Sequence, residues 1–172
     1  MADSFPLEIW ITTDAATANA AEPNEEVCGG WGAVLLFGPF SKPVCGGLRN
    51  TSPIELELAA VAGALGYVKR PVPAVITVAS RLEAIDIPAL VSEAKAADWK
   101  NAEGVESHLS PFLKRIDELT APFEGKIRWN WVRVSSPSAS DGKYLIQARN
   151  KAKEGLCEML RAKASESKPD AA

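Results

Sequence analysis

Asp14 follows an apolar stretch near the N-terminus, and it is the first residue whose position suggests chemistry. Apolar and polar side chains alternate over residues 7–14, which read LEIWITTD, and this period of two is typical of a β-strand. A carboxylate held where a buried strand ends is well placed to bind a metal ion. It can equally begin a loop, because a turn-prone stretch of small residues follows it.

The chain offers few other side chains for metal binding or nucleophilic catalysis. His108 is the single histidine, which excludes zinc sites built on imidazole and triads that depend on histidine. Cys28, Cys45 and Cys157 are odd in number and lack the spacing of metal ligands. We therefore expect packed or free thiols and a reducing, intracellular compartment.

Length and composition limit the classes of protein to which the chain can belong. Its 172 residues, 47% of them hydrophobic, suffice for one domain, expected at residues 1–164 and followed by a disordered tail at 165–172. No apolar run reaches the length of a membrane span, so we expect a soluble protein that does not bind membranes. The net charge of −3 disfavours indiscriminate binding to polyanions but leaves a local basic face open.

Hydrophobic periodicity and turn residues predict the elements that position Asp14. Thr51 or Ser52 can cap the first helix, with Glu55 in a near capping box, and Pro88 leaves open an interruption of the second helix. A strand, a helix and a strand in succession favour parallel pairing with a right-handed crossover. The order is β-β-β-α-β-α-α-β-α, with strands expected at 7–14, 28–38, 42–49, 74–79 and 127–134 and helices at 53–68, 82–97, 107–119 and 141–164.

Five short segments in this order carry a resemblance to a known family. They are TTDAA (12–16), GGWGAVL (29–35), ELAAVAGAL (57–65), DWKNA (98–102) and IRWNWV (127–132). Over nearly its whole length the chain resembles the ribonuclease H family, and it looks closer to the RNase H domains of reverse-transcribing elements than to the cellular enzyme. The resemblance implies an RNase H-like α/β fold, a five-stranded mixed sheet flanked by helices.

The resemblance also implies a reaction. In this family, acidic residues hold two Mg²⁺ or Mn²⁺ ions about 3.5–4 Å apart, which hydrolyse the RNA strand of RNA/DNA hybrids. Two dications so close together repel each other unless negatively charged ligands surround them.

Carried over residue by residue, the family's acidic set is incomplete in this sequence. Asp14 matches the first carboxylate and Glu57 the second, so these two are the expected metal ligands. Ser80 stands where the third carboxylate is expected, and a neutral hydroxyl is a poor ligand for a hard dication. The fourth position falls on Leu145, although a shortened loop would let Asp141, which also suits a helix N-cap, replace it. The resemblance therefore implies weak binding of Mg²⁺ or Mn²⁺, or none.

Binding of nucleic acid could survive without catalysis. The expected contacts are Trp99 and Lys100, where the family can carry a basic handle for its substrate, together with Arg133 and Lys143. Glu22, Glu25 and Glu26 lie in the loop after Asp14, where they would repel phosphates. The last helix is basic and carries Lys143, Arg149, Lys151, Lys153, Arg161 and Lys163.

Three hypotheses follow. The favoured one is a catalytically impaired RNase H-like domain, derived from a retroelement, that serves as a nucleic-acid-binding or scaffold module. The second is an active ribonuclease H in which Glu83 substitutes for the missing carboxylate. The third is a structural subunit that docks onto a protein partner in a larger assembly, because a protein tolerates the acidic loop better than a polyanion does.

Overall fold

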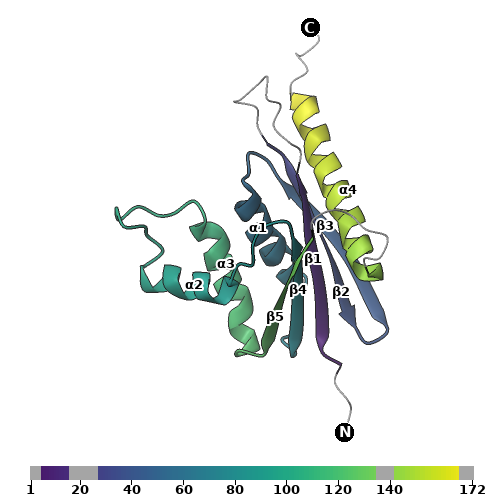
Figure 1. Ribbon diagram of the computed structural model, residues 1–172, viewed down its shortest axis with the longest axis horizontal. Coiled ribbons are helices and arrows are strands. Elements are labelled where there is room, and N and C mark those ends of the chain that lie inside the picture. Colours follow the sequence, from purple (N-terminus) through teal and green to yellow (C-terminus); the bar gives the residue numbers. More distant parts are fainter. Residues whose placement is uncertain (1–4, 16–26, 135–141, 167–172) are drawn as a thin grey trace.

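The computed structural model describes residues 5–15, 27–134 and 142–166, which build one five-stranded sheet with helices on both faces (Figure 1). The elements follow the expected order, so the predicted α/β class and element sequence are confirmed. Their bounds are β1 (Leu7–Ala15), β2 (Gly29–Phe37), β3 (Phe40–Leu48), α1 (Pro53–Leu65), β4 (Ala74–Ser80), α2 (Ile87–Ala96), α3 (Ser110–Thr120), a 3-10 turn (Ala121–Phe123), β5 (Ile127–Arg133) and α4 (Lys143–Glu166).

β1 is the central strand of the sheet, whose strand order is β3-β2-β1-β4-β5. β1, β2 and β3 pair antiparallel, whereas β4 pairs parallel with β1 and β5 pairs parallel with β4, as the succession of elements predicted. The hydroxyl of Thr12 donates a hydrogen bond to the carbonyl of Ala79 across the β1–β4 pair (3.1 Å). The C-terminal ends of β1 and β4 therefore meet at one edge, and Asp14 and Ser80 lie there.

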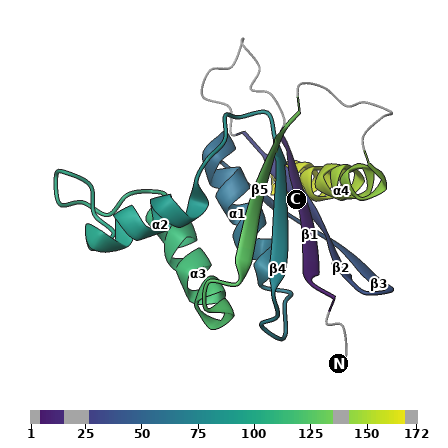
Figure 2. The same cartoon turned by 60° about the horizontal axis from the view of Figure 1, so that its bottom comes forward.

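Helices cover the two faces of the sheet unequally (Figure 2). α1 packs on one face, with α3 beside it, and α4 packs alone on the other face against β1, β2 and β3. The core between the sheet and α1 contains the fully buried side chains of Ile9, Ile11 and Ile76, which burial of apolar surface stabilises.

Trp31 fixes α1 against the sheet. Its indole ring fills a slot between Gly63 of α1 and Gly46 of β3, and a Cβ atom at either glycine would come within 2.3–2.6 Å of the ring. Trp31 therefore packs against α1 as well as against β3.

Two glycines of β2 let α4 approach the opposite face closely. A Cβ atom at Gly32 would lie 2.1 Å from the carbonyl oxygen of Ala148, and one at Gly30 would lie 2.1 Å from the backbone nitrogen of Leu156. Any side chain at these positions would push the helix away, so the two glycines set the height of α4 above the sheet.

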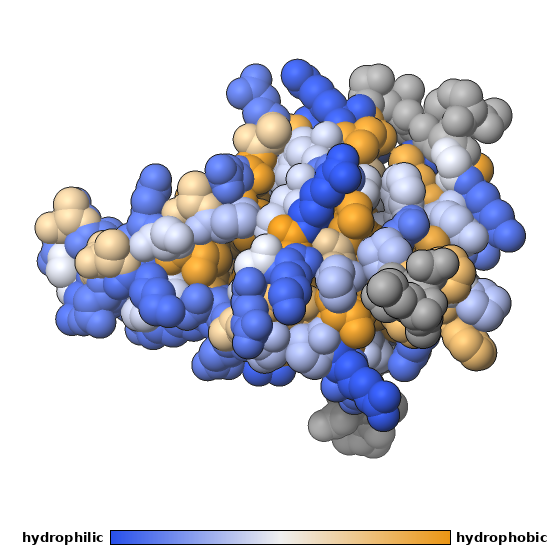
Figure 3. Space-filling view, turned by 90° about the horizontal axis from the view of Figure 1, so that it is seen from below, coloured by the Kyte–Doolittle hydropathy of each residue, from blue (hydrophilic) through white to orange (hydrophobic). Residues whose placement is uncertain are grey.

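α2, the loop of residues 97–109 and α3 form a lobe that projects from the body of the molecule on the α1 side (Figure 1). In the space-filling view from below, apolar residues occur on the visible face as separate small areas among hydrophilic ones (Figure 3). No helix within the described residues is long and apolar enough to cross a lipid bilayer.

The helix predicted over residues 82–97 begins only at Ile87, which corrects the sequence prediction. Asp86 caps this helix by accepting a hydrogen bond from the backbone N–H of Ala89 (3.0 Å). Pro88 stands in the first turn, where its missing N–H removes no intrahelical hydrogen bond, so it begins the helix instead of interrupting it.

α4 ends later than predicted. It continues to Glu166, two residues into the segment that was expected to be a disordered tail. The carboxylate of Glu166 accepts a hydrogen bond from Arg49 (2.7 Å), which ties the last turn of α4 to the chain that leaves β3.

Candidate functional site

Glu57 and Ser80 meet at the edge of the sheet where β1 and β4 end. α1 starts with the capping box formed by Ser52 and Glu55. The side chain of Glu57, in the second turn of this helix, points inward and is 4% exposed. Ser80 is the last residue of β4 and is 2% exposed. The structure thus brings together two of the residues that the sequence placed in the site.

The hydroxyl of Ser80 forms a hydrogen bond with the Glu57 carboxylate. Its Oγ donates a hydrogen bond to Oε1 of Glu57 and accepts one from the backbone N–H of Leu82 (2.9 Å). The second carboxylate oxygen of Glu57, Oε2, is buried and has no hydrogen-bond partner. A buried carboxylate with one unsatisfied oxygen favours the form that carries a proton or the form that binds a cation.

Burial raises the pKa of Glu57 to about 7, and the hydrogen bond from Ser80 opposes that rise. At neutral pH the carboxyl group is therefore divided between its acid and its anion. A ligand set for divalent cations needs the anion, so the burial works against metal binding at this residue.

Asp14 lies near the end of β1 and borders the same edge, but on the other face of the sheet. It pairs in register with Gly30, whose Cβ position points at α4, so Asp14 shares the α4 face while Glu57 reaches the sheet from α1. Asp14 and Glu57 both line one open pocket of about 460 Å³, here called the Asp14 pocket.

Three basic residues line the Asp14 pocket beside the two acids. Arg81 follows Ser80 directly, and Arg149 and Lys153 come from α4. Among the described residues, the charged side chains of the lining are therefore Asp14, Glu57, Arg81, Arg149 and Lys153.

The described residues do not fit a pair of divalent ions. None of them form a group of three or more aspartate, glutamate, histidine or cysteine side chains that could hold a metal. The Ser80 hydroxyl already donates its proton to Glu57, and the nearby cations add positive charge. Two closely spaced dications need negatively charged ligands to offset their repulsion, and this part of the chain supplies only two candidate carboxylates.

The fourth expected carboxylate has two candidate positions in the sequence. Asp141 lies outside the described residues. Leu145 is in α4, is 5% exposed, and offers no atom that could bind a metal. The residues of α4 that do line the pocket are Arg149 and Lys153, one and two turns further along the helix.

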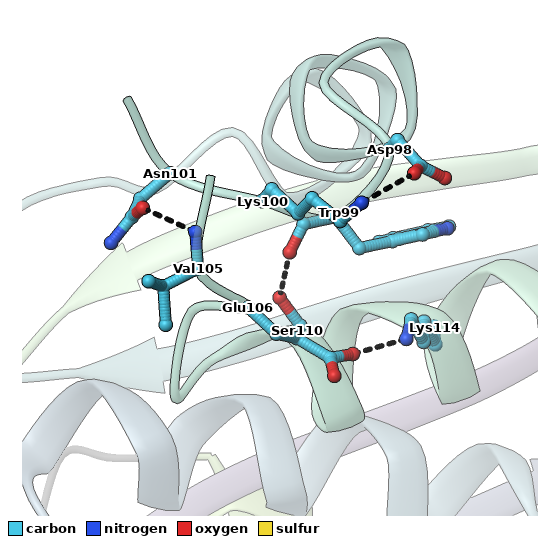
Figure 4. A network of polar contacts seen from close by, with 8 residues as sticks. All are labelled: Asp98, Trp99, Lys100, Asn101, Val105, Glu106, Ser110 and Lys114. Atoms are coloured by element: carbon cyan, nitrogen blue, oxygen red, sulfur yellow. Dashed lines mark hydrogen bonds and ion pairs between the residues drawn. The ribbon is translucent and has the colours of Figure 1, made fainter. Parts of the chain in front are cut away.

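Trp99 and Lys100 lie in the lobe, where a local network of polar contacts holds the loop (Figure 4). Lys100 forms an ion pair with Asp98 (3.2 Å), and Lys114 forms one with Glu106. Lys100 and Lys114 therefore each have a negatively charged neighbour within the lobe, which weakens the field that a phosphate would meet.

The backbone of this loop holds Trp99 in a demanding conformation. Asp98 and Trp99 both have positive φ angles, 52° and 63°, in the left-handed region that residues other than glycine rarely adopt. Their N–H groups close the end of α2, and the hydroxyl of Ser110 donates a hydrogen bond to the carbonyl of Trp99 (2.7 Å). The indole is half-buried and packs against the core, which fits a structural role.

The two other predicted nucleic-acid contacts lie away from the lobe. Arg133 is exposed at the end of β5 and pairs in register with Ser80, which places it beside the pocket edge. Lys143 is exposed at the first position of α4, with its ammonium group 5.7 Å from the ring of Tyr144. The four predicted contacts are thus divided among the lobe, β5 and α4.

The sequence prediction missed the convergence of three cations on the pocket. The sequence gives no reason to assign a role to Arg81, and it indicates Arg149 and Lys153 only as members of a basic helix. Their spacing of four residues could have indicated a shared helix face, but the strand edge that this face meets depends on how α4 sits on the sheet.

Comparison with known proteins identifies similar chains and folds, although no family model matches this chain. A ribonuclease H of Acidovorax sp. (strain JS42) is 33% identical over 126 residues, which cover 73% of this chain and 82% of that protein. The RNase H domain of PFV, solved in solution, has a TM-score of 0.65 at 18% identity, over 90% of this chain and 96% of that domain.

A second solved structure is the foamy viral protease-reverse transcriptase in complex with an RNA/DNA hybrid. Its TM-score is 0.66 at 14% identity, and the match covers 89% of this chain but spans only 20% of the viral chain. At these identities the two viral structures show a shared fold and nothing finer.

Proposed function

The chain belongs to the ribonuclease H family, and from this premise we propose that it is a nucleic-acid-binding RNase H-like domain whose cleavage of RNA/DNA hybrids is strongly impaired. The observation that carries the proposal is the contact between Ser80 and Glu57. At the end of β4, where the family resemblance expects a carboxylate, a neutral hydroxyl donates its proton to the only buried acid of the described part of the site.

Charge supports the proposal. A missing third carboxylate removes one negative charge from a centre that must offset about four positive ones. Arg81 and Lys153 also line this pocket, and basic side chains near the carboxyl groups further disfavour cations there. A Mg²⁺ or Mn²⁺ ion would then bind weakly at best, with Asp14 and Glu57 as its ligands.

The direct test is cleavage of a labelled RNA/DNA hybrid in Mg²⁺ or Mn²⁺. We expect the natural chain to show little or no cleavage, and Ser80→Asp to gain activity if Asp14, Glu57 and Asp141 still converge. Ser80→Asn, which adds similar volume without charge, is the matched control and is expected to stay inactive. Rapid cleavage by the natural chain that Asp14→Asn abolishes would overturn the proposal.

A second candidate is an active nuclease in which Glu83 supplies the missing charge. The observation that favours it is the Oε2 atom of Glu57, which is buried without a partner and could face a cation. This candidate predicts Mn²⁺ binding in the micromolar to millimolar range that Glu57→Gln removes. Calorimetry that detects no metal binding would exclude it.

The partner of the proposed domain is an RNA/DNA hybrid or another nucleic acid. A viral protein of the same fold has been solved in complex with such a hybrid, which supports this choice of ligand. An origin in a reverse-transcribing element, and a scaffold role on a protein partner, remain predictions. Salt-dependent binding to a labelled hybrid separates the nucleic-acid role from the scaffold role, because contacts with phosphates release counterions.

A further inference from the structure

β5 is an edge strand, and its outer side pairs with no other strand of the described part of the chain. The carbonyl of Lys126 accepts a hydrogen bond from the N–H of Ala74 (2.9 Å), and the N–H of Val134 donates one to the carbonyl of Ser80 (2.8 Å). Successive residues of a strand direct their backbone groups to opposite sides, so even-numbered residues face β4 and odd-numbered residues face outward. Another extended backbone can therefore pair with the N–H and C=O groups of Ile127, Trp129, Trp131 and Arg133.

An apolar pocket borders the first half of this edge. It has a volume of about 500 Å³ and lies between β5 and the lobe, with Ile127 and Trp129 on one side and Val91 and Ile116 on the other. The lobe extends past β5 in both ribbon views, so the pocket lies beside the outer edge of the strand (Figures 1 and 2). A strand added to β5 would direct every second side chain toward this pocket.

The opposite face of β5 presents positive charge. Arg128 alternates with Ile127 and Trp129, so its side chain points away from the lobe, and it is exposed. Within the residues that the structure describes, Arg128 forms no ion pair with an acid. An acidic side chain on a strand beside β5 would meet complementary charge there.

Space and symmetry disfavour a second copy of this chain as the added strand. Two copies joined antiparallel through β5 would be related by a two-fold axis perpendicular to the sheet, which places both lobes on the same face of the joint. Each lobe already extends past its own β5, so the two lobes would compete for the same space (Figure 2). A single extended peptide needs only the width of one strand, about 4.8 Å.

We propose that the outer edge of β5 binds an extended peptide of a protein partner by strand addition, and that apolar and acidic side chains alternate in this peptide. The apolar side chains enter the pocket beside Ile127 and Trp129, and the acidic ones lie beside Arg128. Hydrogen bonds between the main chains give affinity, and the alternation of side chains gives specificity. This inference goes beyond the proposed function and does not depend on it.

The probe is a labelled peptide of alternating valine and glutamate, equal in length to the seven residues of β5 and titrated into the full chain up to millimolar concentration. We expect saturable binding by fluorescence anisotropy and slower hydrogen exchange at the amides of Ile127, Trp129 and Trp131. The amides of Arg128 and Asn130, which face β4, should change little. No binding at millimolar peptide, or equal protection of odd-numbered and even-numbered amides, overturns the inference.

Variants of the probe test the backbone pairing and the charge. Methyl groups on alternate amides of the peptide face β5 in one probe and solvent in the other, so the first should lose binding and the second should keep it. Lysine in place of glutamate should weaken binding about tenfold, because lysine would meet Arg128. If both methylated probes bind alike, the strand addition is refuted.

Variants of the chain test the pocket and the charge separately. Ser92→Trp fills the pocket from α2 and should weaken binding of the valine–glutamate probe about tenfold. Glu93→Trp is its matched control, since Glu93 is exposed on the same helix but does not line the pocket. Arg128→Glu should weaken binding about tenfold, and Arg161→Glu on α4 should not. All four residues are exposed, so the variants are expected to fold, and circular dichroism checks this. Equal weakening within either pair contradicts the inference.

The same amides report on other occupants of the edge. Protection of Ile127, Trp129 and Trp131 without peptide, increasing with protein concentration, would identify a second copy of the chain. Protection by an RNA/DNA hybrid, with no binding of the peptide, would identify nucleic acid. Either result overturns the assignment to a peptide.

Discussion

The lobe and the Asp14 pocket both carry basic side chains, but the acidic residues around those side chains differ. In the lobe, Lys100 and Lys114 each form an ion pair with an acid of the same segment. In the pocket, the described lining has three basic residues, Arg81 after β4 and Arg149 and Lys153 of α4, and two acids, Asp14 and Glu57. The comparison teaches that the segment that resembles a basic handle in sequence pairs its charges locally, whereas the basic residues of the pocket come from segments that lie far apart in the chain.

The largest expected effect concerns the close packing of α4 on the sheet. This packing positions residues of the pocket but none of the lobe. Gly32→Ala places a Cβ atom 2.1 Å from the carbonyl oxygen of Ala148, so we expect a loss of about 3 kcal/mol or more in the free energy of unfolding. Gly104→Ala in the lobe meets no atom within 4 Å and has only its φ of 75° to oppose it, so about 1 kcal/mol is expected. Urea denaturation of both variants measures the difference, and equal losses would contradict this account.

The next effect is the pH dependence that the Glu57 carboxyl group confers on stability. Because its pKa is raised to about 7 in the folded protein, the folded state binds the proton more tightly than the unfolded state does. Stability therefore falls as pH rises from about 4.5 to about 7, by about 2–3 kcal/mol.

Glu57→Gln removes this titration, so its stability relative to the natural chain should increase between pH 5 and pH 8. Ser80→Ala should steepen the fall of the natural chain, since the lost hydrogen bond supports the anion. Thermal denaturation across this pH range checks both variants. A pH profile identical in Glu57→Gln and the natural chain would refute the role given to burial.

The third effect sharpens the comparison of the two regions in binding. We expect Lys100→Ala to change the affinity for an RNA/DNA hybrid less than twofold, because Asp98 already offsets its charge. Lys153→Ala in the pocket should weaken binding about tenfold. If Lys100→Ala lowers the affinity more than Lys153→Ala does, the loop that contains Lys100 binds the hybrid despite its ion pairs.

The smallest effect concerns the stability of the lobe. Both residues of the Lys100–Asp98 pair are exposed, so Asp98→Asn should change the free energy of unfolding by less than about 1 kcal/mol, and less still in high salt. Urea denaturation at low and high ionic strength measures this. A loss well above that size would show that the charge of Asp98 stabilises the lobe far more than an exposed ion pair normally does.

The sequence was sufficient to predict most of the architecture because the relevant signals are local. Alternation over residues 7–14 and the capping residues before Pro53 specify β1 and the start of α1 without reference to the rest of the chain. The start of α2 was predicted wrongly, since apolar residues from Leu82 onward continue a helical pattern while Asp86 supplies the actual cap.

The site was less accessible from the sequence, because it depends on contacts between distant segments. Ser80 could be placed opposite Glu57 only by resemblance, and the hydrogen bond that occupies its hydroxyl needed coordinates. The position of Arg149 depends on the glycines of β2, more than a hundred residues earlier in the chain. The ion pairs of the lobe likewise could not be derived from composition. Composition gives the number of charged residues but does not show that Lys100 pairs with Asp98 and Lys114 with Glu106.

The slot that holds Trp31 has a consequence for how this chain can vary. Gly63 belongs to α1 and Gly46 to β3, yet both touch the same indole ring. A methyl group at either position demands a smaller ring, and a smaller ring leaves a void that the other glycine cannot fill. The three positions therefore constrain one another, and an acceptable substitution at one of them requires a matching change at its neighbours.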